Sequence, residues 1–168
     1  MIPTSATKIT TLEPGDQLTF DIWREDGFER VPVTLTVGRL DDAAKDVFRR
    51  GQCYGFALAL QTLTGWPLVF VARQSCDGDP TRAHVEVGSD CTCRFTHAAV
   101  LSDDGWYLDV DGMRPAERVR SDAAKQNLQI EPATDAMLEA VLSSPAVTAQ
   151  HFEAAMLFAD ALMRSMVS

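Results

Sequence analysis

Three residues in the sequence have the types, the order and the spacing of a thiol-dependent acyl-transfer centre. Cys53 opens a strongly apolar run, His97 lies in an alternating segment, and Asp109 lies in the segment that follows it. A cysteine at a helix start has its thiolate favoured by the positive end of the helix dipole. An imidazole that holds the thiol proton, itself oriented by a carboxylate, then gives a thiolate that attacks a carbonyl carbon.

The Asp-Asp-Gly turn between the two alternating segments decides whether the histidine and the aspartate can meet. If it forms a three-residue hairpin loop, His97 faces Asp111 and Ala99 faces Asp109, so both aspartates share the face of the imidazole. We favour Asp109 as the orienting carboxylate, because Asp111 precedes a glycine and is expected in a turn. Asp111 is the alternative.

Other groups of such a centre have candidates as well. Backbone N–H groups at the helix start would stabilise an oxyanion, with the Gln52 side chain as a helper. His84 is the alternative catalytic histidine, since it also lies in an apolar alternation, although it has no carboxylate as a hairpin partner. Acyl transfer to water would make the protein a hydrolase, and transfer to an amine would make it a transferase.

The remaining cysteines offer a second kind of chemistry. Cys91 and Cys93 place two sulfurs on the same side of a predicted strand, and His84 and His97 are nearby in the sequence. Thiolates and imidazoles are the ligands that zinc prefers. No paired Cys-x-x-Cys knuckle accompanies them, so we expect structural thiols, or a reversible disulfide with Cys76, rather than a metal. The sequence therefore predicts no metal and no cofactor.

Composition limits the class of protein. A chain of 168 residues with 46% hydrophobic and 23% charged residues fits one compact soluble domain. The absence of a long apolar run and of a basic, then apolar, N-terminus predicts a cytoplasmic protein that neither spans a membrane nor is exported, with reduced thiols. The formal charge of −9 argues against nucleic acid as a partner, because nucleic-acid binders cluster lysine and arginine.

Hydrophobic periodicity predicts an α+β fold with an antiparallel sheet. In chain order it indicates a β-hairpin (17–24 with 31–37, around an Asp-Gly turn), a short helix (43–48), a central helix (53–64), and strands at 66–72, 84–87, 95–101 and 106–110. We expect the central helix to pack on the sheet, because it is apolar nearly all round. The single domain 1–168 then consists of an N-terminal hairpin (1–40), a catalytic-type core (41–112) and a mainly helical part (113–168).

The C-terminal part is predicted to be mainly helical. Residues 113–120 look irregular, Ser121 is expected to cap a short helix, and Pro132 is expected to introduce two further helices. The last helix carries an apolar stripe over 152–166 at spacings of three and four. We expect this stripe to pack on the domain's own core, with a partner protein as the alternative. His151, in its first turn, is expected at the surface.

Residues 51–57, with the sequence GQCYGFA, resemble the cysteine motif that opens the central helix of papain-like thiol proteases. The segment from His97 to Asp109, with its Asp-Gly-aromatic turn, is similar to the strands of transglutaminase-like and arylamine N-acetyltransferase-like members of that superfamily. The resemblance covers roughly residues 41–112. It implies a papain-like fold with Cys53 as nucleophile, although Gln52 adjoins the cysteine, whereas those proteases place their oxyanion glutamine several residues earlier.

Three classes of function follow from these patterns. The first is a cysteine hydrolase or acyltransferase acting on an amide, peptide, isopeptide or thioester, with a protein or peptide as substrate. The second is a non-catalytic protein-binding module that retains the fold, and the third is a small zinc or redox domain using Cys91 and Cys93. A reactive Cys53 favours the first class, an unreactive Cys53 the second, and bound zinc the third.

Overall fold

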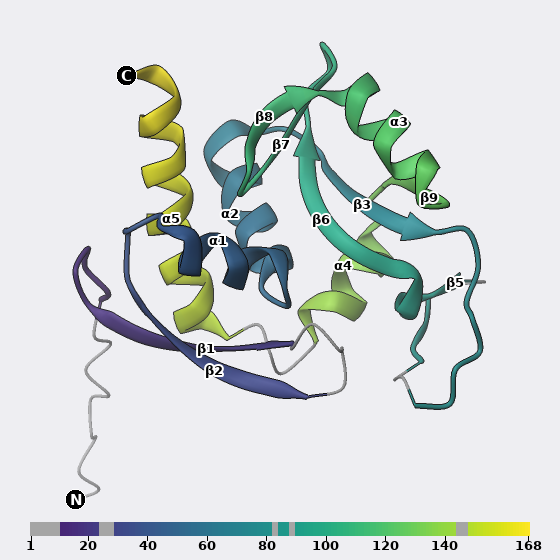
Figure 1. The fold of residues 1–168 in the computed structure, drawn as a ribbon, viewed down its shortest axis with the longest axis horizontal. Helices are drawn as coiled ribbons and strands as arrows, with labels where there is room; N and C mark the ends of the chain where they lie inside the picture. The colour runs from purple at the N-terminus through teal and green to yellow at the C-terminus, as the bar shows by residue number, and fades with distance from the viewer. Residues whose placement is uncertain (1–10, 24–28, 82–83, 88–89, 144–147) are drawn as a thin grey trace, which may run out of the picture.

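A five-stranded antiparallel sheet forms the centre of the computed structural model, which describes residues 11–23, 29–81, 84–87, 90–143 and 148–168 (Figure 1). The strand order is β8-β7-β6-β3-β9. The strands are β3 (Leu68–Arg73), β6 (Phe95–Leu101), β7 (Trp106–Asp109), β8 (Gly112–Pro115) and β9 (Leu128–Pro132). An α+β class with an antiparallel sheet, as the sequence predicts, is therefore confirmed.

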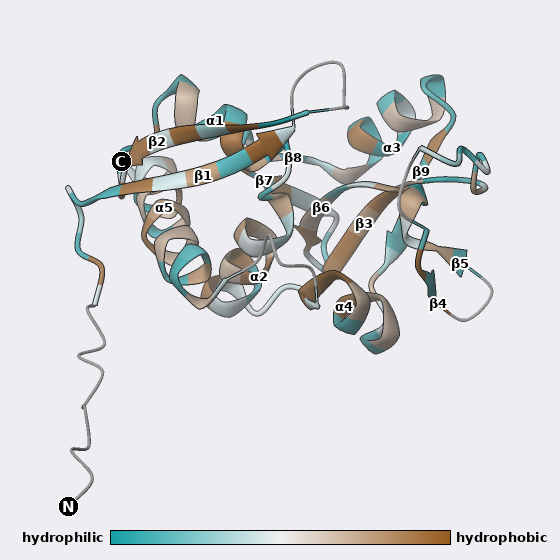
Figure 2. Ribbon diagram, turned by 90° about the horizontal axis from the view of Figure 1, so that it is seen from below, coloured by the Kyte–Doolittle hydropathy of each residue, from teal (hydrophilic) through white to brown (hydrophobic). Residues whose placement is uncertain are grey.

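The sheet is covered on both faces. Strand β3 is apolar along almost its whole length, as its colour in Figure 2 shows, because Leu68 and Phe70 face one core while Val69 and Val71 face the other. Helix α3 (Ala116–Lys125) covers the smaller core, and the other helices contribute to the larger one. They are α1 (Asp42–Arg49), α2 (Cys53–Thr64), α4 (Asp135–Leu142) and α5 (Ala149–Val167).

Helix α2 lies between α5 and the sheet, as its all-round apolar sequence predicts. It ends at Gly65, whose left-handed backbone (φ 72°) accommodates the turn into β3. The stripe of α5 packs on the domain's own core through Ala155, Phe158 and Leu162, which confirms that expectation. Among the described residues, no helix has both the length and the apolarity that a membrane crossing requires.

The N-terminal hairpin forms a separate two-stranded sheet of β1 (Gln17–Trp23) and β2 (Arg30–Thr36). The Asp-Gly turn predicted between them lies outside the described residues. Phe20 packs edge-on against Phe48 and Phe158, which ties the hairpin to α1 and α5. His151 stacks on Phe20 at 4.7 Å and bonds the Thr19 carbonyl, so it is partly buried and the surface expectation for it is wrong.

The segment after Gly112 is more regular than its sequence indicates. Residues predicted as irregular form β8 and the first part of α3, and Ser121 lies inside α3 rather than at its cap. Strand β8 has no clear alternation of its own and is held by pairing with β7. Pro132 ends the edge strand β9, and Thr134 and Thr148 cap α4 and α5, the two helices expected after this proline. Pairing with neighbours, which periodicity does not report, explains these corrections.

Candidate active site

Cys53 is the first residue of α2 and is 4% exposed. The chain turns from α1 into α2 at Gly51, whose φ of +113° is a conformation that other residues rarely adopt. A Cβ at this glycine would lie 3.5 Å from a Trp23 ring atom and 3.7 Å from the Asp21 carbonyl oxygen. Strand β1 thus passes close to the turn that precedes Cys53.

The start of α2 is electrostatically unlike the starts of its neighbours. Side chains of Asp41, Thr134 and Thr148 cap α1, α4 and α5, but α2 has no side-chain cap and no acidic residue in its first turn. The first N–H groups of any helix lack intrahelical acceptors, and they carry the positive end of the dipole. Cys53, as the first residue of α2, places a thiol that can become an anion at this uncapped helix start.

Gln52 occupies the N-cap position and is 2% exposed. Its side-chain amide donates to the backbone carbonyl of Asp21 at 3.4 Å. The predicted oxyanion helper thus lies beside Cys53, but its amide contacts strand β1. The backbone N–H groups of the first turn are the donors that already point along the helix axis.

His97 lies on β6 with its ring between two partners. Its Nε2 is 3.0 Å from Asp109 Oδ2, and the Cys53 thiol lies close enough to influence the pKa of the ring. The side chain is 19% exposed. Burial lowers the pKa of His97, but the hydrogen bonds to Asp109 and Cys53 outweigh it and raise the pKa to about 10. At neutral pH the ring is therefore an imidazolium, the form that pairs with a thiolate.

Asp109 is a buried carboxylate with several donors. Besides His97, it accepts from Arg114 Nη2 at 2.6 Å and from the backbone N–H of Asp111 at 2.9 Å. Burial raises the pKa of Asp109, but the hydrogen bond and charge of His97, together with Arg114, outweigh it and hold the pKa below its ordinary value. The site therefore holds an ionised carboxylate behind a protonated imidazole.

The register of the β6–β7 hairpin explains why Asp109 is the partner of His97. Val100 pairs with Leu108 and Leu101 with Tyr107, which confirms the three-residue loop that the sequence predicts. In this register Asp109 continues the face of His97. Asp111 lies beyond the end of β7, where its carboxylate pairs with Arg49 through Nε at 2.9 Å.

The predicted residues separate into two places. Cys53, His97 and Asp109 come together, and Asp111 lies close by in its own ion pair. His84 lies elsewhere, with Nδ1 at 3.3 Å from the Cys76 sulfur. No bond between His84 and the first group is found in the described structure.

A hollow of about 330 Å³ opens beside this site. Its lining combines the sheet and α3, and it includes His97, Tyr107, Asp109 and Arg114. Cys53 is not part of the described lining, so the imidazole is the group that connects the sulfur with the hollow. A cavity of this size suits a small side chain or a short acyl group rather than a large cofactor.

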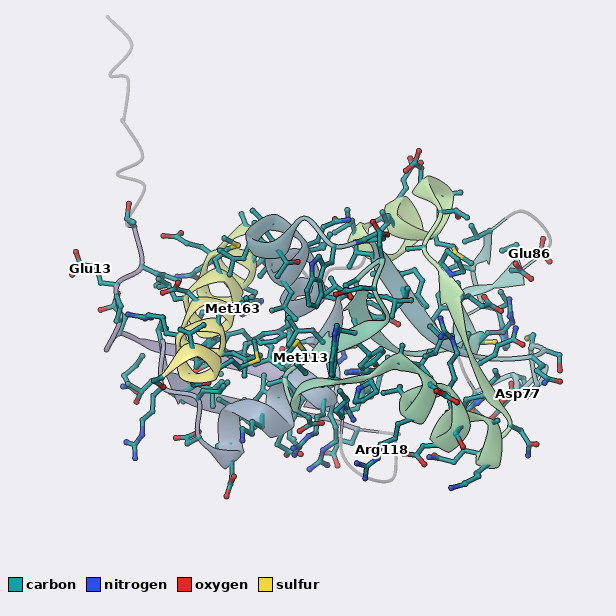
Figure 3. All side chains as sticks on the ribbon, turned by 90° about the horizontal axis from the view of Figure 1, so that it is seen from above. Glu13, Asp77, Glu86, Met113, Arg118 and Met163 are labelled. Carbon is teal, nitrogen blue, oxygen red and sulfur yellow. The ribbon has the colours of Figure 1, made fainter. Side chains whose placement is uncertain are left out.

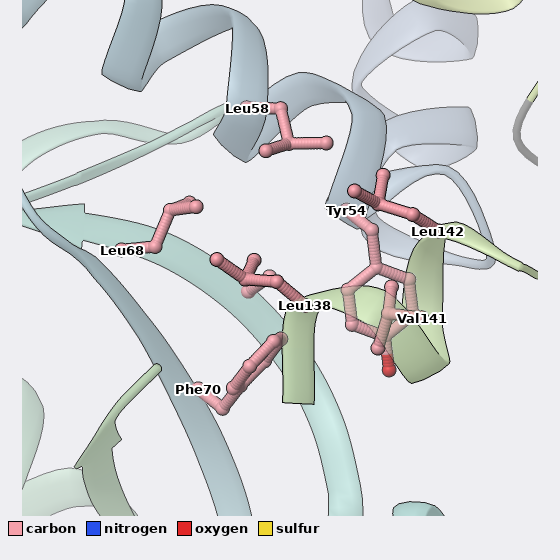
Figure 4. A pocket seen from close by; sticks show the side chains of 8 residues that line it. Tyr54, Leu58, Leu68, Phe70, Leu138, Val141 and Leu142 are labelled. Carbon is pink, nitrogen blue, oxygen red and sulfur yellow. The ribbon is translucent and has the colours of Figure 1, made fainter. Parts of the chain in front are cut away.

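A second depression, between α2, α4 and the opposite face of the sheet, is a packing contact (Figure 4). Tyr54 and Leu58 of α2 face Phe70 of the sheet and Leu138 of α4, and the space left is about 10 Å³. Such a space holds at most one water molecule. The contact fixes α2 against the sheet and so helps to hold Cys53 in place.

Arg114 is a site residue that the sequence alone did not indicate. It bonds Asp109 and lies over the Tyr107 ring, with 5.2 Å from its guanidinium carbon to the ring centroid. It belongs to β8, in the segment expected to be irregular. Recognition of a second tight hairpin at Gly112 would have placed this cation across from β7.

No protein-family model matches the chain, and no curated protein or solved structure shows significant similarity to it.

Proposed function

We propose that this protein is a cysteine-dependent hydrolase or acyltransferase of papain-like architecture. Cys53 is the nucleophile, His97 the acid and base, and Asp109 the group that orients the imidazole. The observation that carries this proposal is the His97 ring held between the thiol at the start of α2 and a buried carboxylate. The order Cys, His, Asp along a helix and two antiparallel strands is consistent with a papain-like core.

The reaction begins with attack of the Cys53 thiolate on an amide, peptide, isopeptide or thioester carbonyl. A carbon–sulfur bond forms and the carbonyl electron pair moves to oxygen, where the N–H groups at the start of α2 stabilise it. Collapse of this intermediate expels the leaving group, which takes the proton of the His97 imidazolium. The product of this half-reaction is an acyl thioester on Cys53.

The second half-reaction regenerates the thiolate. Water or an amine attacks the thioester carbonyl while His97 takes the proton of the attacking group, and the Cys53 thiolate leaves. Asp109 stabilises the imidazolium in each half-reaction, and Arg114 keeps this carboxylate in position. We place the reaction in the cytoplasm with a protein or peptide as substrate.

A non-catalytic binding module is the second candidate, and the low exposure of Cys53 favours it. A nucleophile that is 4% exposed meets a substrate only if the groups above it shift. In that case the buried trio would act as a structural hydrogen-bond network. The two candidates differ in one measurable property, which is whether an acyl group can be trapped on Cys53.

Acyl transfer from p-nitrophenyl acetate tests the proposal. We expect the intact mass of the native protein to increase by one acetyl group, and peptide mapping to place that group on Cys53. The Cys53→Ser variant should show no thioester, while His151→Gln, a matched change at a histidine outside the site, should acetylate like the parent. Acetylation spread over all thiols, or absent from Cys53, would contradict the hydrolase proposal.

A further inference from the structure

Four potential metal ligands converge at the end of the molecule opposite to the N-terminal hairpin. They are Cys76, His84, Cys91 and Cys93, and their ligand atoms all lie within 4.8 Å of one another. Asp77 and Glu86, which flank them in the sequence, lie at this end in Figure 3, far from Glu13. This cluster is separate from the Cys53 site, because the two share no residue. The histidine of the cluster is His84, which contacts Cys76, whereas the histidine of the Cys53 site is His97, which contacts Asp109.

The individual distances describe a compact tetrad. His84 Nδ1 is 3.3 Å from the Cys76 sulfur and 3.2 Å from the Cys91 sulfur, and the Cys93 and Cys76 sulfurs are 3.2 Å apart. In a tetrahedral zinc site with zinc–sulfur bonds of about 2.3 Å, neighbouring sulfurs are roughly 3.7 Å apart. The separations in the tetrad, 3.2–3.3 Å for these three pairs and at most 4.8 Å overall, are therefore close to those of a tetrahedral site.

The backbone fixes the imidazole in the form that a metal needs. His84 Nε2 lies 2.6 Å from the backbone carbonyl oxygen of Asp79. A carbonyl oxygen only accepts hydrogen bonds, so Nε2 must carry the proton and the lone pair of a neutral ring lies on Nδ1, which faces the sulfurs. Ligating histidines commonly have such a second partner, which sets both the tautomer and the ring orientation.

A backbone donor also faces one of the sulfurs. The N–H of Gly78 donates to the Cys76 sulfur at 3.4 Å. A hydrogen bond of this kind favours the thiolate, which is the form that binds a metal. Cys93 lies in a 3₁₀ turn, Thr92–Arg94, so the predicted strand geometry of the Cys91–Cys93 pair is wrong.

We propose that Cys76, His84, Cys91 and Cys93 bind one Zn²⁺ ion in a structural site. Four protein ligands close a tetrahedron and leave no open position, which is typical of structural and not catalytic zinc. The proposal departs from the expectation of no metal, because the spacing of these residues in the sequence contains no Cys-x-x-Cys knuckle and only the fold brings all four together.

A disulfide between Cys76 and Cys93 is the competing interpretation. Their sulfurs are close enough for oxidation to bring them together, but they are 3.2 Å apart, against about 2.05 Å in a disulfide. A disulfide would also leave Cys91, a buried thiol, and the oriented His84 without a role. Zinc uses all four side chains, which is why we favour it.

The site would hold the ends of two central strands. Cys76 follows β3, and Cys93 lies in the turn that leads into β6, the strand that carries His97. Arg94 is buried beside the cluster, where it donates to the Arg73 carbonyl at 2.8 Å and pairs with Asp90. Zinc would therefore fix the connection between β3 and β6 to the sheet at both of its ends.

Metal content of the full chain, purified under reducing and anaerobic conditions, tests the proposal. We expect elemental analysis to find one zinc per chain, and Co²⁺ substitution to give the charge-transfer and ligand-field absorption of a tetrahedral thiolate site. The Cys53→Ser variant should bind the same amount, which separates this proposal from the proposed catalytic function. Cys91→Ser should lose most of the zinc.

A second measurement keeps the proposal testable even if Cys91→Ser does not fold. In the parent protein, a thiol reagent should modify Cys76, Cys91 and Cys93 slowly until a zinc chelator is added, and quickly afterwards. A protein that contains no zinc and does not take up one equivalent of added Zn²⁺ or Co²⁺ would overturn the proposal. A Cys76–Cys93 disulfide found in freshly purified, non-reduced protein would do the same.

Discussion

The molecule contains two histidines that each face cysteine sulfur, and they differ in the group on their other ring nitrogen. Behind His97 lies the buried carboxylate of Asp109, whereas behind His84 lies the backbone carbonyl of Asp79. A carboxylate stabilises an imidazolium, which is useful for holding and moving a proton. A neutral carbonyl acceptor fixes one tautomer of the ring and leaves a lone pair for a metal.

The two histidines also differ in the secondary structure that holds them and their partners. His97 lies on a central strand and its thiol partner begins a helix, so both are held by regular structure. His84 and its partners lie in a connection with two-residue strands, β4 (Glu86–Val87) and β5 (Asp90–Cys91). A proton-transfer pair requires a fixed geometry, while a connection of this kind gains its fixed geometry from a bound ion. The group on the second ring nitrogen, a carboxylate for His97 and a backbone carbonyl for His84, thus distinguishes proton transfer from metal binding more than the cysteine sulfur does.

Removal of the carboxylate behind His97 should have the largest effect. For Asp109→Asn we expect acetylation of Cys53 to slow on the order of 10³-fold, because the imidazolium loses its stabilising charge and its correct tautomer. Stopped-flow release of p-nitrophenol measures the rate. The matched variant Asp111→Asn should slow it less than about threefold, since Asp111 pairs with a partly exposed arginine instead. A larger effect of Asp111→Asn than of Asp109→Asn would show that Asp111, and not Asp109, orients the imidazole.

Removal of the proposed zinc should mainly affect stability. We expect a chelator to lower the melting temperature by on the order of 10 °C, because the ion binds the folded connection between β3 and β6 but has no preformed site in the unfolded chain. Calorimetry with and without chelator reports the change, and Cys53→Ser should show the same difference. An unchanged melting temperature would mean that the four side chains hold no metal that stabilises the fold.

The pH dependence of the free energy of unfolding should reveal whether His97 and Asp109 form a charged pair in the folded protein. The pKa of His97 rises from about 6.5 in the unfolded chain to about 10 in the folded one, so its contribution is complete below pH 6.5 and is lost as pH rises toward 10. Asp109, with its lowered pKa, acts in the opposite sense and loses its contribution as the pH falls. Urea unfolding of the parent and of His97→Gln at a series of alkaline pH values measures the contribution of His97.

Over this alkaline range we expect the free energy of unfolding of the parent to fall by at most about 1.4 kcal/mol per pH unit relative to His97→Gln. The comparison with the variant cancels the titration of groups that both proteins share. Parallel pH profiles for the two proteins would show that His97 is not held as an imidazolium in the folded state.

Much of the catalytic-type site could be predicted from the sequence because its parts are local. The apolar run after Cys53, the glycine before it and the Asp-Asp-Gly turn each leave a pattern within a few residues, and the turn fixes the register that brings Asp109 to His97. Arg114 was missed because it depends on β8, an edge strand with no apolar alternation.

The cysteine cluster could not be predicted in the same way. Its ligands have no short repeated spacing, and Cys76 joins the others only because β3 and β6 are neighbours in the sheet. Strand β9 was missed for a related reason, since its pairing with the far edge of β3 is a long-range contact. In both cases the information lies in strand pairing, which hydrophobic periodicity does not encode.

The relative reactivity of Cys53 toward iodoacetamide tests the central claim most directly. In a brief labelling of the native, zinc-replete protein near neutral pH, we expect Cys53 to be modified faster than Cys76, Cys91 or Cys93, and His97→Asn to abolish this advantage by removing the imidazolium partner. Mass spectrometry of the labelled peptides gives the four rates. Protection of Cys53, or equal labelling of Cys53 in the parent and in His97→Asn, would contradict the account.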